Sequence, residues 1–360
     1  MYVKERYNYS SLIMKVCFFG IYEPEYSRNR VLAQGFRENG YEVVECRVDP
    51  KRYRGGRKFW YLFREYYKIR NIVFDIVLVA FPGHTVTWFA YILFGRKIIF
   101  DAFVSLYNSE VEDRRTVSKR SFSALYYWFL DWISCTLASK ILLDTNAHIA
   151  YFVKKYHISA EKFTRVFVGT TSRDFYPAVV KNTGGKFIVH FHGTFIPLQG
   201  IEYIVRAAKL LEHDKDIVFR IIGSGQEYAR VQALVRKEEV HDIVFIPRVS
   251  LSDLRAYIQK ADVCLGIFGD TVKSRMVIPN KIYEALACKK PVITQKSDAI
   301  KELLIDQESV LLCGGGDAQD LAEKILLLKN DVGLREKIAV SGYDIFIREL
   351  QPSKLVQKIM

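Results

Sequence analysis

Glu284 is an acidic residue inside a short apolar segment, where a carboxylate needs a binding partner. The segment from Pro279 to Thr294 has the pattern of a loop, a short helix, a turn and a buried strand. Proline suits the first turn of a helix, whereas Pro291 cannot continue one. A carboxylate among small apolar neighbours is costly unless it is hydrogen bonded. Ribose hydroxyls could donate to it, and a helix N-terminus could face a diphosphate. We predict a nucleotide site here, with an ordinary capped core helix as the alternative.

Cations close to Glu284 could balance the charge of a diphosphate. Lys281 lies at the start of the same predicted helix, where a solvated lysine would oppose the helix dipole. Fixed positive charge facing a leaving diphosphate stabilises its departure. We therefore assign Lys281 to the phosphates, with an exposed surface lysine as the alternative. Asp270, Lys273 and Arg275 lie in the loop before it and are candidates for contact with a donor sugar or for ordinary loop charges.

A second segment could complete this site. Gly193 ends an apolar strand, a position where the backbone could approach a ligand closely. Thr194 and Gln199 follow it in the loop before the next predicted helix. Arg248 and Val249 follow a later strand and could line a base pocket, although a surface arginine is about equally expected. We include these five residues in the predicted nucleotide and diphosphate site, and a plain tight turn at Gly193 is the alternative.

Two residues in the first half of the chain stand at predicted strand ends. Asp101 follows the strand at 97–100, and His84 follows the strand at 76–80. Catalytic groups of parallel α/β folds concentrate at the carboxyl ends of the strands. We therefore predict that Asp101 and His84 are catalytic, with a buried structural histidine as the alternative for His84.

The segment from Arg47 to Arg70 mixes basic and aromatic residues. Residues 1–180 hold 27 Lys and Arg against 17 Asp and Glu, whereas the whole chain has a net charge of +13, so most of the excess lies in the first half. Such a segment suits anionic lipid headgroups or nucleic acid. We favour a membrane or acceptor surface, and a solvated amphipathic helix is the alternative. The residues assigned to it are Arg54, Arg57, Lys58 and Trp60.

Composition favours a globular protein in a reducing compartment. The six cysteines are widely spaced, with no Cys-x-x-Cys and no cluster of metal-ligand spacing, so we predict no metal site. The polar first residues argue against a secretory signal. Two apolar stretches, 74–100 and 123–143, are interrupted by charged residues or by Pro and Gly, so we expect buried elements and not membrane spans.

Strand-like and helical patterns alternate along the whole chain, which is typical of parallel α/β domains. Strands are expected at 15–20, 41–47, 76–80, 97–100, 141–143 and 164–168, and a second series begins at 187–192. We predict a polar tail at 1–13, an acceptor-binding domain at 14–178, a nucleotide-binding domain at 179–342, and a segment at 343–360 that crosses back to the first domain. Two doubly wound Rossmann-like domains would place a ligand cleft between them.

Several segments, in order, resemble the retaining family-four glycosyltransferases, which have the GT-B fold. The resemblance runs from Met14 over nearly the whole chain. It rests on His192-Gly193-Thr194, Gln199-Gly200-Ile201, the strand and glycine turn at 219–225, the segment 244–249, and Pro279 to Thr294. It implies a sugar transfer from a UDP- or GDP-sugar to a hydroxyl acceptor, with retention of configuration and without metal or other cofactor. The implied acceptor is a membrane-associated glycan or a lipid-linked oligosaccharide.

The chain also departs from the pattern of that family. Thr194 and Gln199 occupy positions where the family carries an arginine and a lysine for the diphosphate, and Met276 replaces the first of two glutamates. A catalytically weak homologue that binds glycan or a partner subunit is therefore the alternative function. Within the main reading, we expect a cytoplasmic protein at the inner face of the cell membrane, with no nucleic-acid partner.

Overall fold

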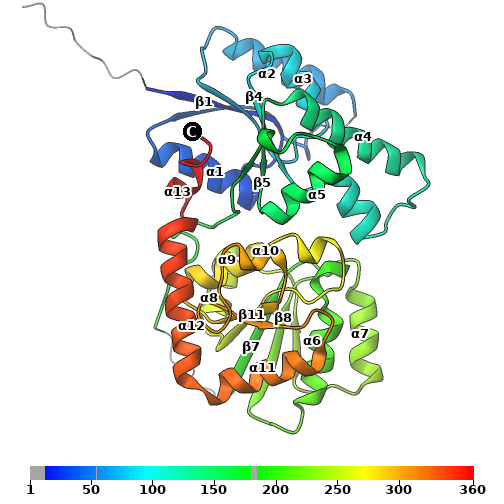
Figure 1. The fold of residues 1–360 in the computed structure, drawn as a ribbon, viewed down its shortest axis with the longest axis vertical. Coiled ribbons are helices and arrows are strands. Elements are labelled where there is room, and N and C mark those ends of the chain that lie inside the picture. Colours follow the sequence, from blue (N-terminus) through cyan, green and yellow to red (C-terminus); the bar gives the residue numbers. More distant parts are fainter. Residues whose placement is uncertain (1–12, 54, 180–184) are drawn as a thin grey trace, which may run out of the picture.

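The computed structural model describes residues 13–53, 55–179 and 185–360, which form two α/β domains (Figure 1). Each domain is built on a six-stranded parallel sheet. The predicted fold class, two doubly wound Rossmann-like domains, is confirmed.

The first sheet has the strand order β2-β1-β3-β4-β5-β6. Its strands are β1 (Lys15–Ile21), β2 (Glu42–Val48), β3 (Ile76–Val79), β4 (Ile98–Phe103), β5 (Lys140–Leu143) and β6 (Phe163–Arg165). The helices of this domain are α1 (Ser27–Glu38), α2 (Arg57–Ile69), α3 (Thr87–Phe94), α4 (Phe122–Leu137) and α5 (Asn146–Tyr156), with a π-helical turn η1 (Asn108–Asp113) and a 3-10 turn η2 (Ala160–Lys162). The long apolar runs of β1 and β4 are buried on both faces, as expected of a parallel sheet between helices.

The second sheet has the order β12-β11-β10-β7-β8-β9. Its strands are β7 (Phe187–His192), β8 (Ile217–Ile222), β9 (Ile243–Ile246), β10 (Val263–Leu265), β11 (Val292–Gln295) and β12 (Leu311–Cys313). The helical segments are η3 (Pro197–Gln199), α6 (Ile201–Leu210), α7 (Tyr228–Lys237), α8 (Leu251–Gln259), η4 (Lys273–Arg275), α9 (Asn280–Ala287), α10 (Asp298–Lys301), α11 (Ala318–Asn330) and α12 (Val332–Ile345). The strand order reverses between β7 and β10, which is where doubly wound sheets bind ligands.

Loops at the carboxyl ends of the two sheets meet each other. Thr145, which follows β5, donates a hydrogen bond to the carbonyl of Met276, which follows β10. Glu302, at the end of α10, accepts hydrogen bonds from the amides of Asn146 and Ala147 at 2.8 Å each. These contacts place the strand ends of both domains at one shared boundary.

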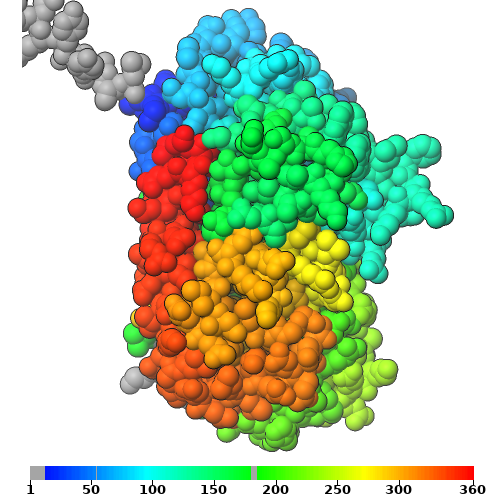
Figure 2. All heavy atoms as spheres, in the orientation of Figure 1, coloured from blue at the N-terminus to red at the C-terminus, as the bar shows by residue number. Residues whose placement is uncertain are grey.

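The last segment of the chain returns to the first domain. After α12, the turn η5 (Phe346–Leu350) leads to α13 (Pro352–Val356), which packs against α1. The Nδ2 of Asn39 donates to the carbonyl of Ser353 at 2.9 Å, and Gly35 leaves room for the Pro352 carbonyl, to which an added Cβ would come within 2.2 Å. Figure 2 shows this segment, in red, lying along the surface of the first domain. The two domains are therefore tied by the chain end as well as by the loops between them.

Candidate functional site

The loop between β7 and α6 lies against the start of α9. Gly193 has a φ of 155°, a conformation that other residues rarely adopt. A Cβ added at Gly193 would lie 3.0 Å from the Nζ of Lys281. Glycine at this position therefore lets the lysine ammonium approach the backbone of the loop.

Lys281 is buried, with 5% of its surface exposed. Its Nζ donates to the Oε1 of Gln199 and lies 3.5 Å from the carbonyl oxygen of Gly266. It also lies 3.7 Å from the centre of the Phe191 ring. Burial lowers the pKa of Lys281 well below its ordinary value, and Glu284 opposes that shift. The neighbouring protein groups therefore do not offset the cost of burying the Lys281 ammonium.

Glu284 lies inside α9 and pairs with a histidine from β7. Its Oε2 is 2.6 Å from the Nε2 of His192, and 12% of its side chain is exposed. In the part of the chain that the structure describes, no hydrogen bond reaches its Oε1. Glu284 therefore keeps one carboxylate oxygen available as an acceptor.

The structure gathers four predicted residues, Gly193, Gln199, Lys281 and Glu284, at the carboxyl end of β7. Thr194 is adjacent and exposed. Arg248 and Val249 follow β9, two strands away from β7 in the same sheet, and Arg248 is exposed.

The three predicted donor-sugar residues separate into two environments. Asp270 and Arg275 are both exposed and form an ion pair with each other. Lys273 is buried, and its Nζ donates to the Oγ of Ser109 in the first domain at 2.6 Å. Burial lowers the pKa of Lys273 to about 8, and Asp113 opposes the shift. Lys273 is thus part of the contact between the domains.

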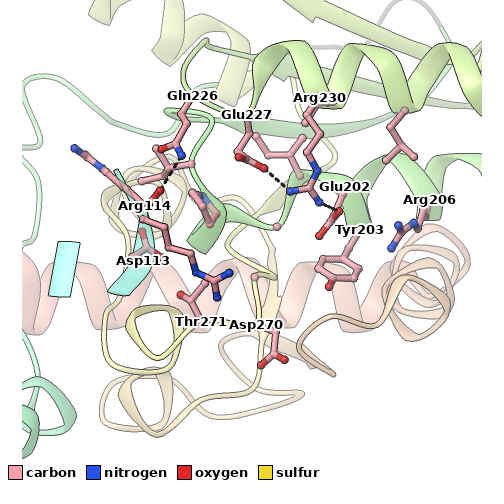
Figure 3. Close-up of a pocket in the computed structure, with 18 of the residues that line it drawn as sticks. Asp113, Arg114, Glu202, Tyr203, Arg206, Gln226, Glu227, Arg230, Asp270 and Thr271 are labelled. Atoms are coloured by element: carbon pink, nitrogen blue, oxygen red, sulfur yellow. Dashed lines mark hydrogen bonds and ion pairs between the residues drawn. The ribbon is translucent and has the colours of Figure 1, made fainter. Parts of the chain in front are cut away.

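A pocket of about 580 Å³ lies beside this contact (Figure 3). Its walls come from the first domain at residues 113–115, from α6 and α7, and from the loop at 269–271. Gln226 bridges the domains by donating to the carbonyl of Arg114 at 2.8 Å, and Arg230 bonds Glu202 and Glu227 across one wall. Gly200 connects the pocket wall to the loop that carries Gly193.

Asp113 lines this pocket and was not anticipated from the sequence. It is 1% exposed, and neither carboxylate oxygen has a hydrogen-bond partner in the described part of the chain. Burial raises its pKa, while the charge of Lys273 opposes that effect. The sequence places Asp113 in a charged, loop-like run, where nothing signals burial.

The predicted position of Asp101 is wrong. Strand β4 continues to Phe103, so Asp101 lies within the strand and not at its end. Its carboxylate is fully buried and pairs with Arg28 of α1, with N–O distances of 2.9 to 3.2 Å. Arg28 also donates to the carbonyls of Val166 and Phe167. This closed arrangement holds α1 to the sheet and leaves the carboxylate no access to a cleft.

The predicted position of His84 facing the cleft is also wrong, since the structure agrees with the alternative of a buried histidine. His84 is 1% exposed, and its Nε2 lies 3.1 Å from the carbonyl oxygen of Val104 and 3.4 Å from Asp131. Burial lowers the pKa of His84. Asp131 in turn accepts hydrogen bonds from the amides of Leu106 and Tyr107. His84 therefore belongs to the packing that shapes the loop after β4.

The predicted membrane residues fall on and before α2. Arg57 and Trp60 are exposed on this helix, and Lys58 is half-buried with its Nζ 5.6 Å from the ring centre of Phe59. Arg54 lies outside the described residues. Trp60, Phe63 and Tyr67 are 60%, 47% and 55% exposed, and their spacing places them on one face of the helix.

Two further helices of the first domain expose apolar side chains. Trp88 and Ile92 are exposed on α3. On α4 the exposed residues are Phe122, Leu125, Tyr126 and Phe129. Within the described ranges, none of the helices combines the length and the hydropathy needed to cross a bilayer.

Comparison with known proteins gives the second half of the chain a family likeness. Residues 172–344 match the model of the family described as "Glycosyl transferases group 1". The matched range contains all the residues gathered at the carboxyl end of β7.

Two curated relatives match about half of the chain. An uncharacterized glycosyltransferase of Methanocaldococcus jannaschii is 28% identical over 171 residues, which is 46% of this chain and 44% of that protein. The phosphatidyl-myo-inositol mannosyltransferase of Mycobacterium leprae is 28% identical over 180 residues, which is 49% of this chain and 46% of that protein. The chain thus spans less than half the length of these relatives.

A solved structure matches the whole architecture. Anabaena HepE in complex with UDP superposes with a TM-score of 0.72 over 96% of this chain and 98% of HepE, at 14% sequence identity. HepE has also been solved with UDP-glucose. At this identity the likeness shows the fold, and the fold of this chain is GT-B.

Proposed function

We propose that the protein is a glycosyltransferase that moves a sugar from a UDP- or GDP-sugar to a hydroxyl acceptor. In this reaction the acceptor oxygen bonds to the anomeric carbon, and the bond from that carbon to the phosphate oxygen breaks. The nucleoside diphosphate leaves, and the acceptor hydroxyl loses its proton. The resemblance to family-four enzymes suggests retention of configuration without an essential metal.

The gathering of Gly193, Lys281 and Glu284 at the carboxyl end of β7 is the observation that carries this proposal. The free carboxylate oxygen of Glu284 suits a ribose hydroxyl. Lys281 suits a diphosphate because an anion beside it would favour the ammonium form that burial disfavours. The match to a glycosyltransferase family over residues 172–344 and the UDP complexes of HepE agree with a nucleotide-sugar donor.

The pocket between the domains is a candidate for the transferred sugar or the acceptor. Its wall includes Asp270, Tyr203 and Arg206, together with the unpartnered carboxylate of Asp113. Carboxylates and guanidinium groups bond sugar hydroxyls, and an aromatic ring packs against the apolar face of a sugar. The size of about 580 Å³ is within the range of small-ligand sites.

We further propose that the acceptor is a membrane-associated glycan or lipid-linked oligosaccharide at the inner face of the cell membrane. The exposed aromatic face of α2 and its basic residues support a peripheral contact with anionic lipid. The surface would hold the first domain at the acceptor while the second domain binds the donor.

Titration with UDP and GDP tests the nucleotide site. We expect saturable binding of one of them, and Glu284→Gln should weaken that binding by roughly tenfold to a hundredfold because a charge-assisted hydrogen bond is lost. Lys281→Met should weaken the binding of the diphosphate far more than that of the free nucleoside. Lys301→Met removes an exposed lysine of the same domain outside the predicted site, and as the matched cation control it should leave both affinities unchanged.

Release of nucleotide from UDP-glucose or GDP-mannose separates an enzyme from the alternative of a weak homologue. The replacements at Thr194, Gln199 and Met276 favour that alternative, since they remove charge from the donor site. Turnover supports the transferase, whereas nucleotide or glycan binding without turnover supports a binding subunit. Absence of any nucleotide binding by the folded protein would overturn the proposal.

A further inference from the structure

Four side chains of the second domain form one continuous hydrogen-bonded row that ends at Glu284. Arg220 of β8 lies beside His190 of β7 in the sheet register, and its Nε is 3.3 Å from the Nδ1 of His190. The Nε2 of His190 is 3.1 Å from the Nδ1 of His192. The Nε2 of His192 is 2.6 Å from the Oε2 of Glu284. His190 and His192 share one face of β7 because side chains two residues apart in a strand point the same way.

The chemistry of the first member fixes the direction of every bond in the row. The Nε of an arginine can only donate, so the Nδ1 of His190 must be an acceptor without a proton. A neutral His190 then carries its proton on Nε2 and donates to the Nδ1 of His192. For the same reason His192 carries its proton on Nε2 and donates to Glu284.

Burial keeps the inner member of the row neutral. His190 is fully buried, and burial together with its cationic neighbours lowers its pKa well below the ordinary value. Arg220 is held at its other end by the carbonyl of Tyr257, which accepts from its Nη2. The row therefore begins at a fixed donor, and its hydrogen bonds all keep the direction from Arg220 to Glu284.

We propose that Arg220, His190 and His192 position the Glu284 carboxylate for recognition of a ribose diol. The row occupies Oε2 with a directed bond and leaves Oε1 as the acceptor for the ligand. His190 and His192 act through Glu284 and are positioning residues. This inference rests on the proposed nucleotide site, and it adds a reason why this chain carries the sequence His190-Phe191-His192 before Gly193.

The proposed positioning of Glu284 is tested by the ratio of affinities for UDP and 2′-deoxy-UDP, or for GDP and 2′-deoxy-GDP, because the deoxy forms lack one hydroxyl of the ribose diol. Calorimetry on the full chain should show the ribonucleotide bound roughly tenfold to a hundredfold more tightly by the wild type, the range expected for a charge-assisted hydrogen bond. His192→Phe keeps a planar ring but removes the donor, so the ratio should fall to within about threefold of unity. His190→Phe should lower the ratio less, because His192 stays next to Glu284 but loses its fixed tautomer.

A conservative variant and a distant one serve as controls. Glutamine at position 192 can accept from His190 and donate to Glu284, so His192→Gln should retain most of the ratio and remains informative if His192→Phe does not fold. His241 is an exposed histidine of the same domain, and His241→Phe should leave the ratio unchanged. Circular dichroism and the melting temperature establish that each variant is folded.

The possible failures can be told apart. If the folded wild type binds no nucleotide, the proposed function itself fails. If it binds both nucleotides of a pair equally well, or if the folded His192→Phe and His192→Gln variants both keep the wild-type ratio, the positioning role is overturned while nucleotide binding stands. An equal loss of affinity for the ribo and deoxy forms would also overturn it, because that pattern indicates a role in packing alone.

Discussion

Buried charge serves different ends in the two domains. In the first domain, Asp101 and Arg28 are fully buried, and each satisfies the other with the help of two backbone carbonyls. In the second domain, Lys281 and Glu284 keep 5% and 9% of their surface exposed, and each retains bonding capacity beyond its protein partners. The first arrangement is closed, whereas the second leaves hydrogen-bonding capacity unused.

This difference shows that a buried carboxylate is a weak sign of a binding site by itself. Taking a charge out of water is costly in both domains, and the protein compensates that cost with partners in the first. In the second, the compensation is incomplete at the carboxyl end of β7, where Lys281 and Glu284 lie. The residual bonding capacity, and not the burial, marks the candidate site.

Removal of Asp101 should give the largest effect on stability. Asp101→Ala leaves the Arg28 guanidinium buried without its counter-charge, and breaking a buried pair in this way costs on the order of 3–5 kcal/mol. Chemical denaturation measures the loss. Glu284→Gln should change the unfolding free energy much less, since its carboxylate is partly exposed.

A double replacement sharpens the same comparison. Arg28→Met with Asp101→Leu removes both charges, and it should recover most of the stability lost in Asp101→Ala because no uncompensated charge remains. If Asp101→Ala unfolds as the wild type does but abolishes sugar transfer, then Asp101 belongs to the active site and our structural assignment is wrong.

The sequence predicted the second domain better than the first for a physical reason. Strand β7 was expected at residues 187–192 and occurs there, and Gly193, Lys281 and Glu284 come together as predicted. Glycine and proline mark the ends of these elements, so local signals position the site. Neither glycine nor proline marks the end of β4, where the apolar run resumes at Ala102-Phe103 after the aspartate and extends the strand past Asp101.

Contacts between segments far apart in the chain could not be predicted from the sequence. Arg28 and Asp101 are 73 residues apart, and Lys273 meets Ser109 across 164 residues. The row from Arg220 to Glu284 likewise needs the register of β7 with β8 and the packing of α9. Only the alternation His190-Phe191-His192 could have pointed to it, because a strand places both histidines on one face.

Lys273, at the boundary between the two domains, should show an effect of intermediate size. Its pKa is about 8 in the folded protein, below the ordinary value of 10.5 that applies to the unfolded chain. Between these two values the unfolded chain binds more protons than the folded protein. The free energy of unfolding therefore increases as the pH rises from about 8 to 10.5. Relative to Lys273→Met, the wild type should gain roughly 2–3 kcal/mol between pH 8 and pH 10.5.

Chemical denaturation of both proteins across this pH range measures that difference. Subtracting the unfolding free energy of Lys273→Met from that of the wild type removes the contribution of other groups that titrate in the same pH window. Lys301→Met provides the control because Lys301 is exposed and its charge is solvated in both states. A flat difference for Lys273→Met would mean that water reaches the ammonium and that the contact with Ser109 is open in solution.

The smallest effects concern the surface of the first domain, where charge is exposed and not buried. Each Lys or Arg near an anionic membrane contributes about 1 kcal/mol, and salt screens that contribution. Charge reversal at Arg57 and Lys58 should therefore weaken binding to phosphatidylserine vesicles at low salt. Trp60→Ala should instead lower the binding that persists at high salt, because burial of an aromatic ring is not screened. The matched control is charge reversal at Arg236 and Lys237, which are exposed on α7 of the second domain. It should leave sedimentation with vesicles unchanged. If the wild type does not bind anionic vesicles at low salt, then α2 is a solvated face and the proposed membrane contact fails.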